Sequence, residues 1–365
     1  MRKNTTPCYY GDYLQLDKLL DAQHPESAKY GNEAHDEMLF IVVHQAYELW
    51  FKQMLHELRS VMALFGSDQV PEDKLATAVH RLKRFVNIQQ LINQQIAVLE
   101  TMSPQDFLEF RDYLVPASGF QSIQFKELEI RLGIKRGKRI AFDQKSFYNR
   151  LNDQDRAYLE DLEQQESFAE MLDRWLARLP FLEFGDFAFW DHYRQAADEM
   201  LDSDEAIIRG NPHLDDEELK QQLEELGGTR ARFAALFDEG NHQQLLDSGQ
   251  MELSHRALLS ALFINLYRDE PLFHLPFQLL TCLMEIDEQF TAWRYRHALM
   301  VQRMLGSKIG TGGSSGHDYL KRTTETNRFF KDLYAVSTYL LPKHALPALP
   351  NEVKRELGFH FQGLK

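Results

Sequence analysis

The feature that most constrains this chain is a helical pattern near its C-terminal end that carries one histidine on an apolar face. The residues of this face follow one another at steps of 4, 3, 4, 3 and 4, and they are Ile286, Phe290, Trp293, His297, Met300 and Met304. This is the spacing of one side of an α-helix, so His297 points toward a core. An imidazole there costs free energy unless its nitrogens find partners. The partner is either a nearby carbonyl or carboxylate, as is usual for buried polar groups, or a metal ion.

A glycine-rich loop follows this helix. Gly306 comes directly after the last periodic residue and predicts the helix end, and residues 310–316 then read GTGGSSG. Such a loop visits positive φ readily and offers backbone N–H groups and hydroxyls to a small polar ligand. A flexible linker has a similar composition, but this loop is short and joins two strongly patterned segments. No Gly-Lys-Ser/Thr closes it, so it is not a phosphate loop.

A second histidine occupies an apolar, aromatic face within residues 38–65. The residues of this face follow one another at the same helical steps, and they are Phe40, His44, Tyr47, Phe51, Met54 and Leu58. His44 is open to the same two interpretations as His297. Two helices of this kind can, however, place imidazoles on opposite sides of a flat apolar cofactor.

An arginine on an apolar face follows further along. Ser103, Pro104 and Asp106 predict a capping box at the start of a short helix. Arg111 leaves this helix from the face of Phe107. The guanidinium either extends to solvent or captures a carboxylate in a sheltered pocket, for which its planar fork is suited.

Three segments resemble the tryptophan 2,3-dioxygenase family, and the likeness extends over nearly the whole chain. They are WRYRHALMVQRMLGSKIGTGGSSG at 293–316, HDEMLFIVVHQAYELWFKQM at 35–54 and FLEFRDYLVPASGFQS at 107–122. The resemblance implies an all-α helical bundle enclosing haem b. It also implies insertion of both atoms of O2 across the indole C2–C3 bond of L-tryptophan. The product would be N-formyl-L-kynurenine, in the first step of tryptophan catabolism by the kynurenine pathway.

The resemblance also implies roles for individual residues. His297 matches the proximal ligand of the haem iron, and His44 matches a distal histidine that lies near the indole N–H without binding iron. Arg111 is expected to hold the amino acid carboxylate. The substrate-binding residues implied within the chain's own pocket are Phe40, Phe107, Arg111, Ser118, Gly119 and Thr311.

Residues 1–34 are polar and turn-rich except for an aromatic arm. Tyr10, Tyr13 and Leu14 have little to pack on locally, so the arm either covers its own subunit or reaches a neighbouring one. The resemblance implies the second arrangement, with the arm helping to close a neighbour's substrate site in a homotetramer. Residues 35–365 are expected to form one catalytic domain, with an acidic helical excursion at about 199–240 in which Gly227 and Gly228 stop a helix.

The composition argues against several classes of partner. The chain has 41 Lys+Arg against 55 Asp+Glu and a net charge of −14, whereas nucleic acid binding relies on a basic face. Cys8 and Cys282 are too few for a disulfide framework, which suits a reducing cytosol. No signal peptide or apolar run long enough to span a bilayer is evident. The sequence therefore predicts a soluble, cytoplasmic protein with no membrane partner.

A di-iron carboxylate protein is a competing interpretation. Glu239 and His242, and again Glu252 and His255, have the Glu-x-x-His spacing of such bundles. The first pair spans a helix break expected at Gly240, and the two pairs are too close in sequence to lie on separate long helices.

Two non-enzymatic classes of protein explain fewer features of the sequence. A haem sensor or carrier would need His297 but neither Arg111 nor the Thr311 loop. An all-helical interaction protein would need neither histidine. Among haem enzymes, the nearest competing class is an oxygenase that acts on a modified indole.

Overall fold

The computed structural model describes residues 6–67, 70–135, 147–148, 151–178, 189–306, 327–351 and 353–354. Every regular element within them is a helix, which confirms the predicted all-α fold. The α-helices are α1 Tyr10–Leu14, α2 Leu16–Leu20, α3 His35–Phe65, α4 Glu72–Leu99, α5 Pro104–Phe110, α6 Ile123–Leu132, α8 Asp153–Gln164, α9 Phe168–Ala177, α10 Phe189–Gly210, α11 Asp216–Leu236, α12 Glu239–Asp247, α13 His255–Leu266, α14 His274–Leu305 and α16 Lys331–Ala335. The 3₁₀ helices are η1 Ser27–Tyr30, η2 Arg111–Leu114, η3 Gly119–Gln121, η6 Pro271–Phe273, η7 Val336–Tyr339 and η8 Lys343–Ala345.

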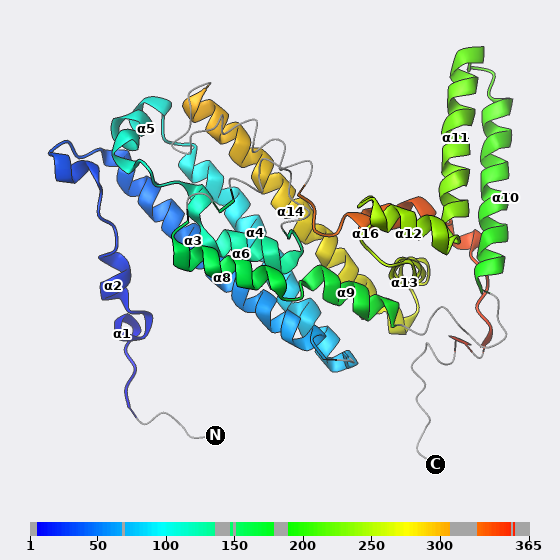
Figure 1. Ribbon diagram of the computed structural model, residues 1–365, viewed down its shortest axis with the longest axis horizontal. Helices are drawn as coiled ribbons and strands as arrows, with labels where there is room; N and C mark the ends of the chain where they lie inside the picture. Colours follow the sequence, from blue (N-terminus) through cyan, green and yellow to red (C-terminus); the bar gives the residue numbers. More distant parts are fainter. Residues whose placement is uncertain are drawn as a thin grey trace.

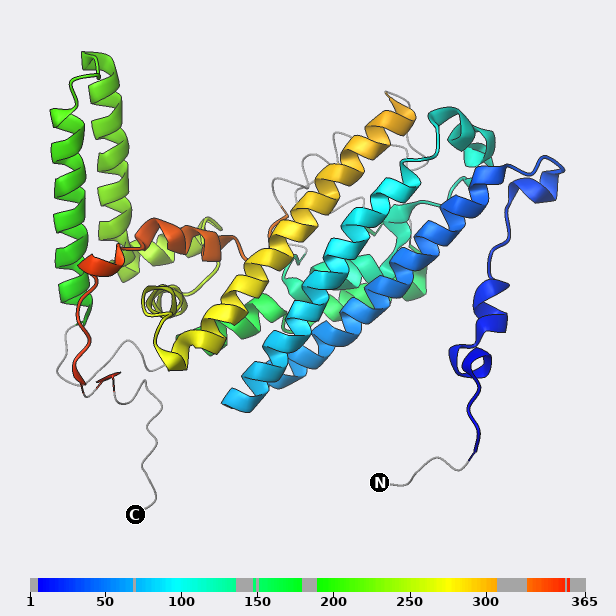
Figure 2. The ribbon, with the colours of Figure 1, turned by 180° about the vertical axis from the view of Figure 1, so that it is seen from behind.

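Three long helices, α3, α4 and α14, form the body of the molecule (Figures 1 and 2). α4 packs along both α3 and α14, because it has buried apolar residues on the sides that face them. Leu82 and Phe85 of α4 are completely buried, as are Leu58 of α3 and Ile286 of α14. Each such side chain contributes about 2 kcal/mol through its removal from water. This shared burial holds the two histidine-bearing helices, α3 and α14, in one rigid frame.

The ends of these helices agree with the local sequence signals. α14 ends at Leu305, and Gly306 takes φ +59°, which glycine adopts without the steric penalty of a Cβ. Pro71 is the N-cap of α4, directly before the first helical residue, Glu72. Ser103 and Asp106 form the predicted capping box, with hydrogen bonds of 3.2 and 3.1 Å between side chains and backbone N–H groups.

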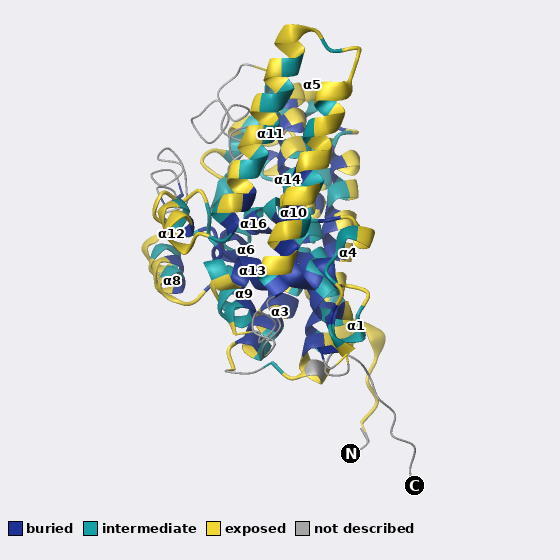
Figure 3. Cartoon of the chain, turned by 90° about the vertical axis from the view of Figure 1, so that its right-hand side faces the viewer, coloured by how far each residue is buried: buried dark blue, intermediate teal, exposed yellow. Residues whose placement is uncertain are grey.

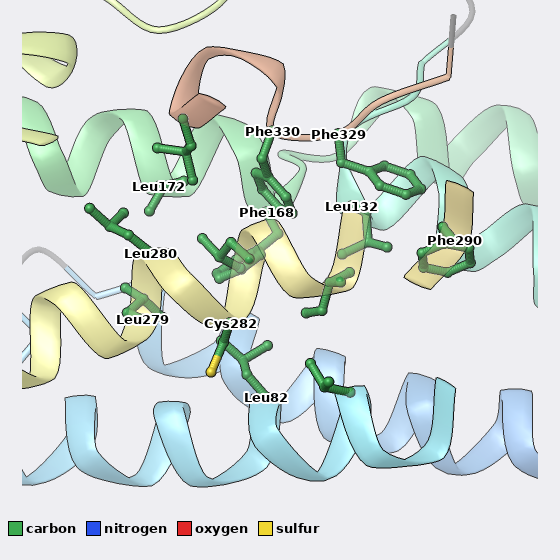
Figure 4. Close-up of a cluster of buried hydrophobic side chains, with 14 of the residues drawn as sticks. Leu82, Leu132, Phe168, Leu172, Leu279, Leu280, Cys282, Phe290, Phe329 and Phe330 are labelled. Carbon is green, nitrogen blue, oxygen red and sulfur yellow. The ribbon is translucent and has the colours of Figure 1, made fainter. Parts of the chain in front are cut away.

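A second layer of shorter helices lies across the long ones. α6 packs on α3 and α8, and α9 packs on α13 and α3. Figure 4 shows a buried cluster around α14 in which Leu280 of α14, Phe168 of α9 and Leu82 of α4 gather. The ring of Phe168 also contacts that of Phe330, with centroids 6.2 Å apart. The C-terminal segment therefore belongs to the same core as the long helices.

The acidic excursion is an antiparallel hairpin of α10 and α11 that projects from the body (Figure 1). Its outer faces are largely exposed (Figure 3). The prediction that Gly227 and Gly228 stop the helix is wrong, because α11 continues to Leu236. Each glycine costs a helix about 1 kcal/mol. Burial of Phe233 and Leu236 beyond them outweighs that cost.

The aromatic arm leaves the body of the molecule (Figure 2). No residue of α1 or α2 is buried. Tyr10 and Tyr13 are each 74% exposed, and Leu14 is 40% exposed. In the single chain these apolar side chains are therefore uncovered. None of the helices in the described ranges combines the length and apolarity needed to cross a membrane.

Candidate functional site

A cavity of about 310 Å³ gathers most of the residues singled out by the sequence. Its size is at the small end of the range for small-molecule sites. α3, α5, α6 and α14 supply most of its walls. The predicted site residues that line it are Phe40, His44, Phe107, Arg111, Ser118, Gly119 and His297.

His297 lies on the α14 wall of this cavity. Its ring stacks on Trp293, with centroids 5.0 Å apart and planes inclined by 26°. Its Nδ1 is buried and has no hydrogen-bond partner among the described residues. Burial, with a smaller contribution from His44, lowers the pKa of His297 to about 4. The imidazole is therefore neutral at pH 7, which is the form that binds metals.

His44 projects into the cavity from α3. Its Nδ1 donates a hydrogen bond of 2.7 Å to the carbonyl of Phe40. Burial lowers the pKa of His44, against the opposing effect of this carbonyl. Since a carbonyl only accepts, Nδ1 carries the proton of the neutral ring, and Nε2 keeps its lone pair. His44 can thus accept a hydrogen bond from a ligand N–H.

Aromatic rings form the apolar walls between the two histidines and the rest of the pocket. The ring of Phe40 lies 4.0 Å from His44 and 5.8 Å from Phe107, centroid to centroid. On the α14 side, Phe125 lies 5.1 Å from Trp293. Such walls favour flat apolar ligands, because they offer large buried area without unpaired polar groups. Together with the buried Nδ1 of His297, they fit a planar group whose metal accepts an imidazole.

Arg111 and Ser118 supply polar groups to the same cavity. The α-helix ends at Phe110, so Arg111 opens the 3₁₀ helix η2 and does not belong to the helix of Phe107, as the sequence had predicted. Its guanidinium is half-buried against the cavity. Ser118 caps η3, and its own backbone N–H donates to the side chain of Gln121 at 3.0 Å. Arg111, the predicted carboxylate anchor, therefore lines the same cavity as Ser118, a predicted substrate-binding residue.

Four charged residues of the cavity were not predicted from the sequence. They are Glu48 of α3, Lys126 and Glu129 of α6, and Arg294 of α14. The ammonium of Lys126 lies 3.7 Å from the centroid of Phe147, and Arg294 forms a 2.7 Å ion pair with Glu129. The available signal was charge within apolar surroundings on α6, where charges are rarely buried without partners.

Four predicted site residues are not among the described residues that line this cavity. Thr311 and the rest of the loop at 310–316 lie outside the described residues. Tyr10, Tyr13 and Leu14 do not line the cavity of their own chain. Their implied role at a neighbour's site stays a prediction.

Comparison with known proteins decides the family. Residues 2–340 match the family model described as Tryptophan 2,3-dioxygenase. The chain belongs to the tryptophan 2,3-dioxygenase family. The relative of that name from Alteromonas mediterranea is 60% identical over 362 residues, which cover 99% of this chain and 100% of the relative. Tryptophan 2,3-dioxygenase from Bdellovibrio bacteriovorus is 46% identical, and the match covers 97% of this chain and 99% of the relative. The enzyme of that name from Mus musculus is 44% identical, and the match covers 93% of this chain and 84% of the relative.

The Glu-x-x-His pairs have a structural explanation. His242 and His255 do lie close, with ring centroids 5.2 Å apart. However, Nε2 of His242 donates to the carbonyl of Leu253 at 2.8 Å, and Nε2 of His255 donates to Leu236 at 2.7 Å. The expected break at Gly240 is wrong, because α12 begins at Glu239 and includes it. Both imidazoles therefore bind backbone carbonyls next to helix ends, one before α13 and one at the end of α11. The described residues contain no cluster of three or more metal-ligating side chains.

Proposed function

We propose that this chain is an L-tryptophan 2,3-dioxygenase that binds haem b and forms N-formyl-L-kynurenine. The observation that carries the proposal is the cavity in which neutral His297 and His44 lie among aromatic walls. Membership of the family and full-length similarity to enzymes of that name support the reaction.

His297 would hold the haem iron through its neutral imidazole. Its neutral imidazole and the apolar rings around it fit such a role, because a neutral histidine has the lone pair that binds metal and a charged one does not. When bound, haem would supply the activation of O2.

The remaining residues would bind and orient L-tryptophan. Arg111 would pair with the carboxylate, and its planar fork would restrict the rotation of the amino acid. Phe40 and Phe107 would enclose the indole. The lone pair on Nε2 of His44 would accept the indole N–H, so that His44 orients the ring and need not transfer a proton. Catalysis by these side chains is then mainly positioning, which can account for several orders of magnitude in rate.

Three further substrate contacts complete the proposal. Ser118 and Gly119, at the start of η3, would border the amino acid end of the substrate. Thr311 would lie over its amino group.

We also infer a homotetramer in which Tyr10, Tyr13 and Leu14 of one chain cover the site of another. Their exposure in the single chain supports this arrangement, since large uncovered apolar segments mark interaction surfaces.

The test is turnover by the purified protein after haem supplementation and reduction. An anaerobic absorption spectrum is recorded first, and aerated L-tryptophan is then added while N-formylkynurenine absorbance is followed. Haem uptake with product formation is expected. Haem uptake without product from L-tryptophan would contradict the reaction, and assays with substituted indoles would then separate another oxygenase from a haem sensor. Failure to bind haem would contradict the whole proposal.

A further inference from the structure

Two arginines on α14 make the same pair of hydrogen bonds on different sides of the helix. Arg294 donates to the carbonyl of Asn327 at 2.5 Å and to Glu129 at 2.7 Å. Arg296 donates to the carbonyl of Asn93 at 3.0 Å and to Glu100 at 2.9 Å. We refer to Arg294–Glu129 as the inner ion pair and to Arg296–Glu100 as the outer ion pair.

The inner ion pair belongs to the wall of the functional cavity, and the outer one does not. Arg294 lies one helical turn before His297 on α14. Glu129 lies on α6, whose chain leads directly back to Ser118 at the start of η3. The inner ion pair therefore links the helix of the proposed iron ligand to the segment that carries the proposed substrate contacts.

The inner ion pair is also far more buried. The Arg294 and Glu129 side chains are 3% and 9% exposed, against 39% and 24% for the outer ion pair. The guanidinium lies beside two rings that contact each other, 5.6 Å from the centroid of Phe290 and 5.4 Å from that of Phe329. Little water can compete for these groups, so the geometry of the two hydrogen bonds is restricted.

Stability alone is a poor explanation for this ion pair. Removing two charges from water costs free energy that their attraction often only offsets, and well-packed apolar residues frequently stabilise such a site equally well. A directional ion pair provides something that apolar packing does not, namely one preferred arrangement of the elements that it joins. Asp287 restrains the same region, since its carboxylate accepts the N–H of Phe329 at 2.9 Å and that of Phe330 at 3.3 Å.

We propose that Arg294 and Glu129 are positioning residues that set the orientation of α14, and thus of His297, relative to the substrate contacts of α5 and η3. Neither residue needs to touch the reacting atoms. This inference rests on the proposed function, because it assumes that His297 binds haem and that L-tryptophan occupies the same cavity.

The experiment compares inner variants with outer variants in the haem-loaded full-length protein. The inner variants are Arg294→Lys, Glu129→Gln and the apolar double variant Arg294→Met/Glu129→Leu. The outer controls are Arg296→Lys and Glu100→Gln. For each protein we would measure thermal stability, the iron–histidine stretching band of the reduced haem by resonance Raman spectroscopy, and the Kd for L-tryptophan.

The inner variants are expected to shift the iron–histidine band and to raise the Kd for L-tryptophan about tenfold, since small misplacements of positioned groups have effects of this order or larger. The apolar double variant should keep wild-type thermal stability but show the same two defects. The outer variants should change neither readout.

Two results would overturn the inference. One is an unchanged band and Kd in the folded inner variants, and the other is full recovery of both in the apolar double variant, which would show that the ion pair only fills space. If the wild-type protein takes up no haem, the proposed function fails first, and this inference fails with it.

Discussion

The buried carboxylate of Glu127 provides a quantitative test of how α6 is held against α3 and α8. Glu127 is 3% exposed and accepts hydrogen bonds from Arg59 at 2.6 Å, from Arg131 at 2.5 Å and from Tyr158 at 2.8 Å. Burial alone would raise the pKa of Glu127, but the hydrogen bonds from Arg131, Arg59 and Tyr158 outweigh it, so the pKa lies below its ordinary value of 4.5.

The substitution Glu127→Gln keeps the shape of the side chain and removes its charge. Hydrogen bonds to a charged group contribute roughly 1 kcal/mol more than neutral ones. Two arginines are affected, and the half-exposed Arg59 contributes less than a buried partner would. We therefore expect the free energy of unfolding to fall by about 1–2 kcal/mol at pH 7.

The effect should depend on pH with a definite sign. A carboxylate whose pKa is lowered by folding stabilises the protein fully above its unfolded pKa, and this stabilisation disappears as pH falls through the folded pKa. The difference between wild type and Glu127→Gln should thus be largest at pH 7 and shrink below pH 4.5, the ordinary glutamate value. Protonated Glu127 then resembles glutamine in charge.

Urea denaturation of both proteins at pH 7 and at about pH 3.5 measures this difference. Glu224→Gln is the matched control, because Glu224 forms a 3.9 Å pair with Lys220 in which both side chains are mostly exposed. It should change stability little at either pH. A difference for Glu127→Gln that is equal at the two pH values would refute the assignment of its stabilisation to the charged form.

Further substitutions test the site and the fold. Arg111→Ala should raise KM for L-tryptophan by one to two orders of magnitude, since a charged hydrogen bond contributes about 2 kcal/mol; unchanged steady-state kinetics would exclude it as the anchor. His44→Ala should lower kcat yet leave measurable turnover, and complete inactivity with haem bound would assign it a chemical role. Gly228→Ala, where an added Cβ meets nothing within 4 Å, should stabilise the protein by about 0.5–1 kcal/mol in thermal unfolding. Gly133→Ala should destabilise it, because φ is +139° and the new Cβ would lie 2.8 Å from that of Ala169.

Features set by neighbouring residues were predictable from the sequence. The apolar face that contains His297, the turn at Gly306 and the capping box at Ser103 all depend on spacings of a few residues. The spacing of the two histidine stripes predicted that His44 and His297 point into the interior, and both side chains line one cavity.

Features that depend on distant residues were not predictable. Glu129 and Arg294 are 165 positions apart, and nothing in either local pattern names the other as its partner. The passage of α11 through Gly227 and Gly228 depends on the burial of Phe233 and Leu236, which outweighs a local preference to stop. Tertiary packing therefore decided the details that local propensity left open or predicted wrongly.

Haem binding by the variant His297→Gly tests whether His297 is the residue that holds the haem iron. Apoprotein is titrated with haem under reducing conditions, and His44→Ala serves as the control because it alters the α3 wall of the same cavity. If His297 holds the haem iron, wild type and His44→Ala bind haem tightly, His297→Gly does not, and added imidazole restores binding to His297→Gly. Tight binding by His297→Gly without imidazole, with the wild-type spectrum, would contradict this role of His297.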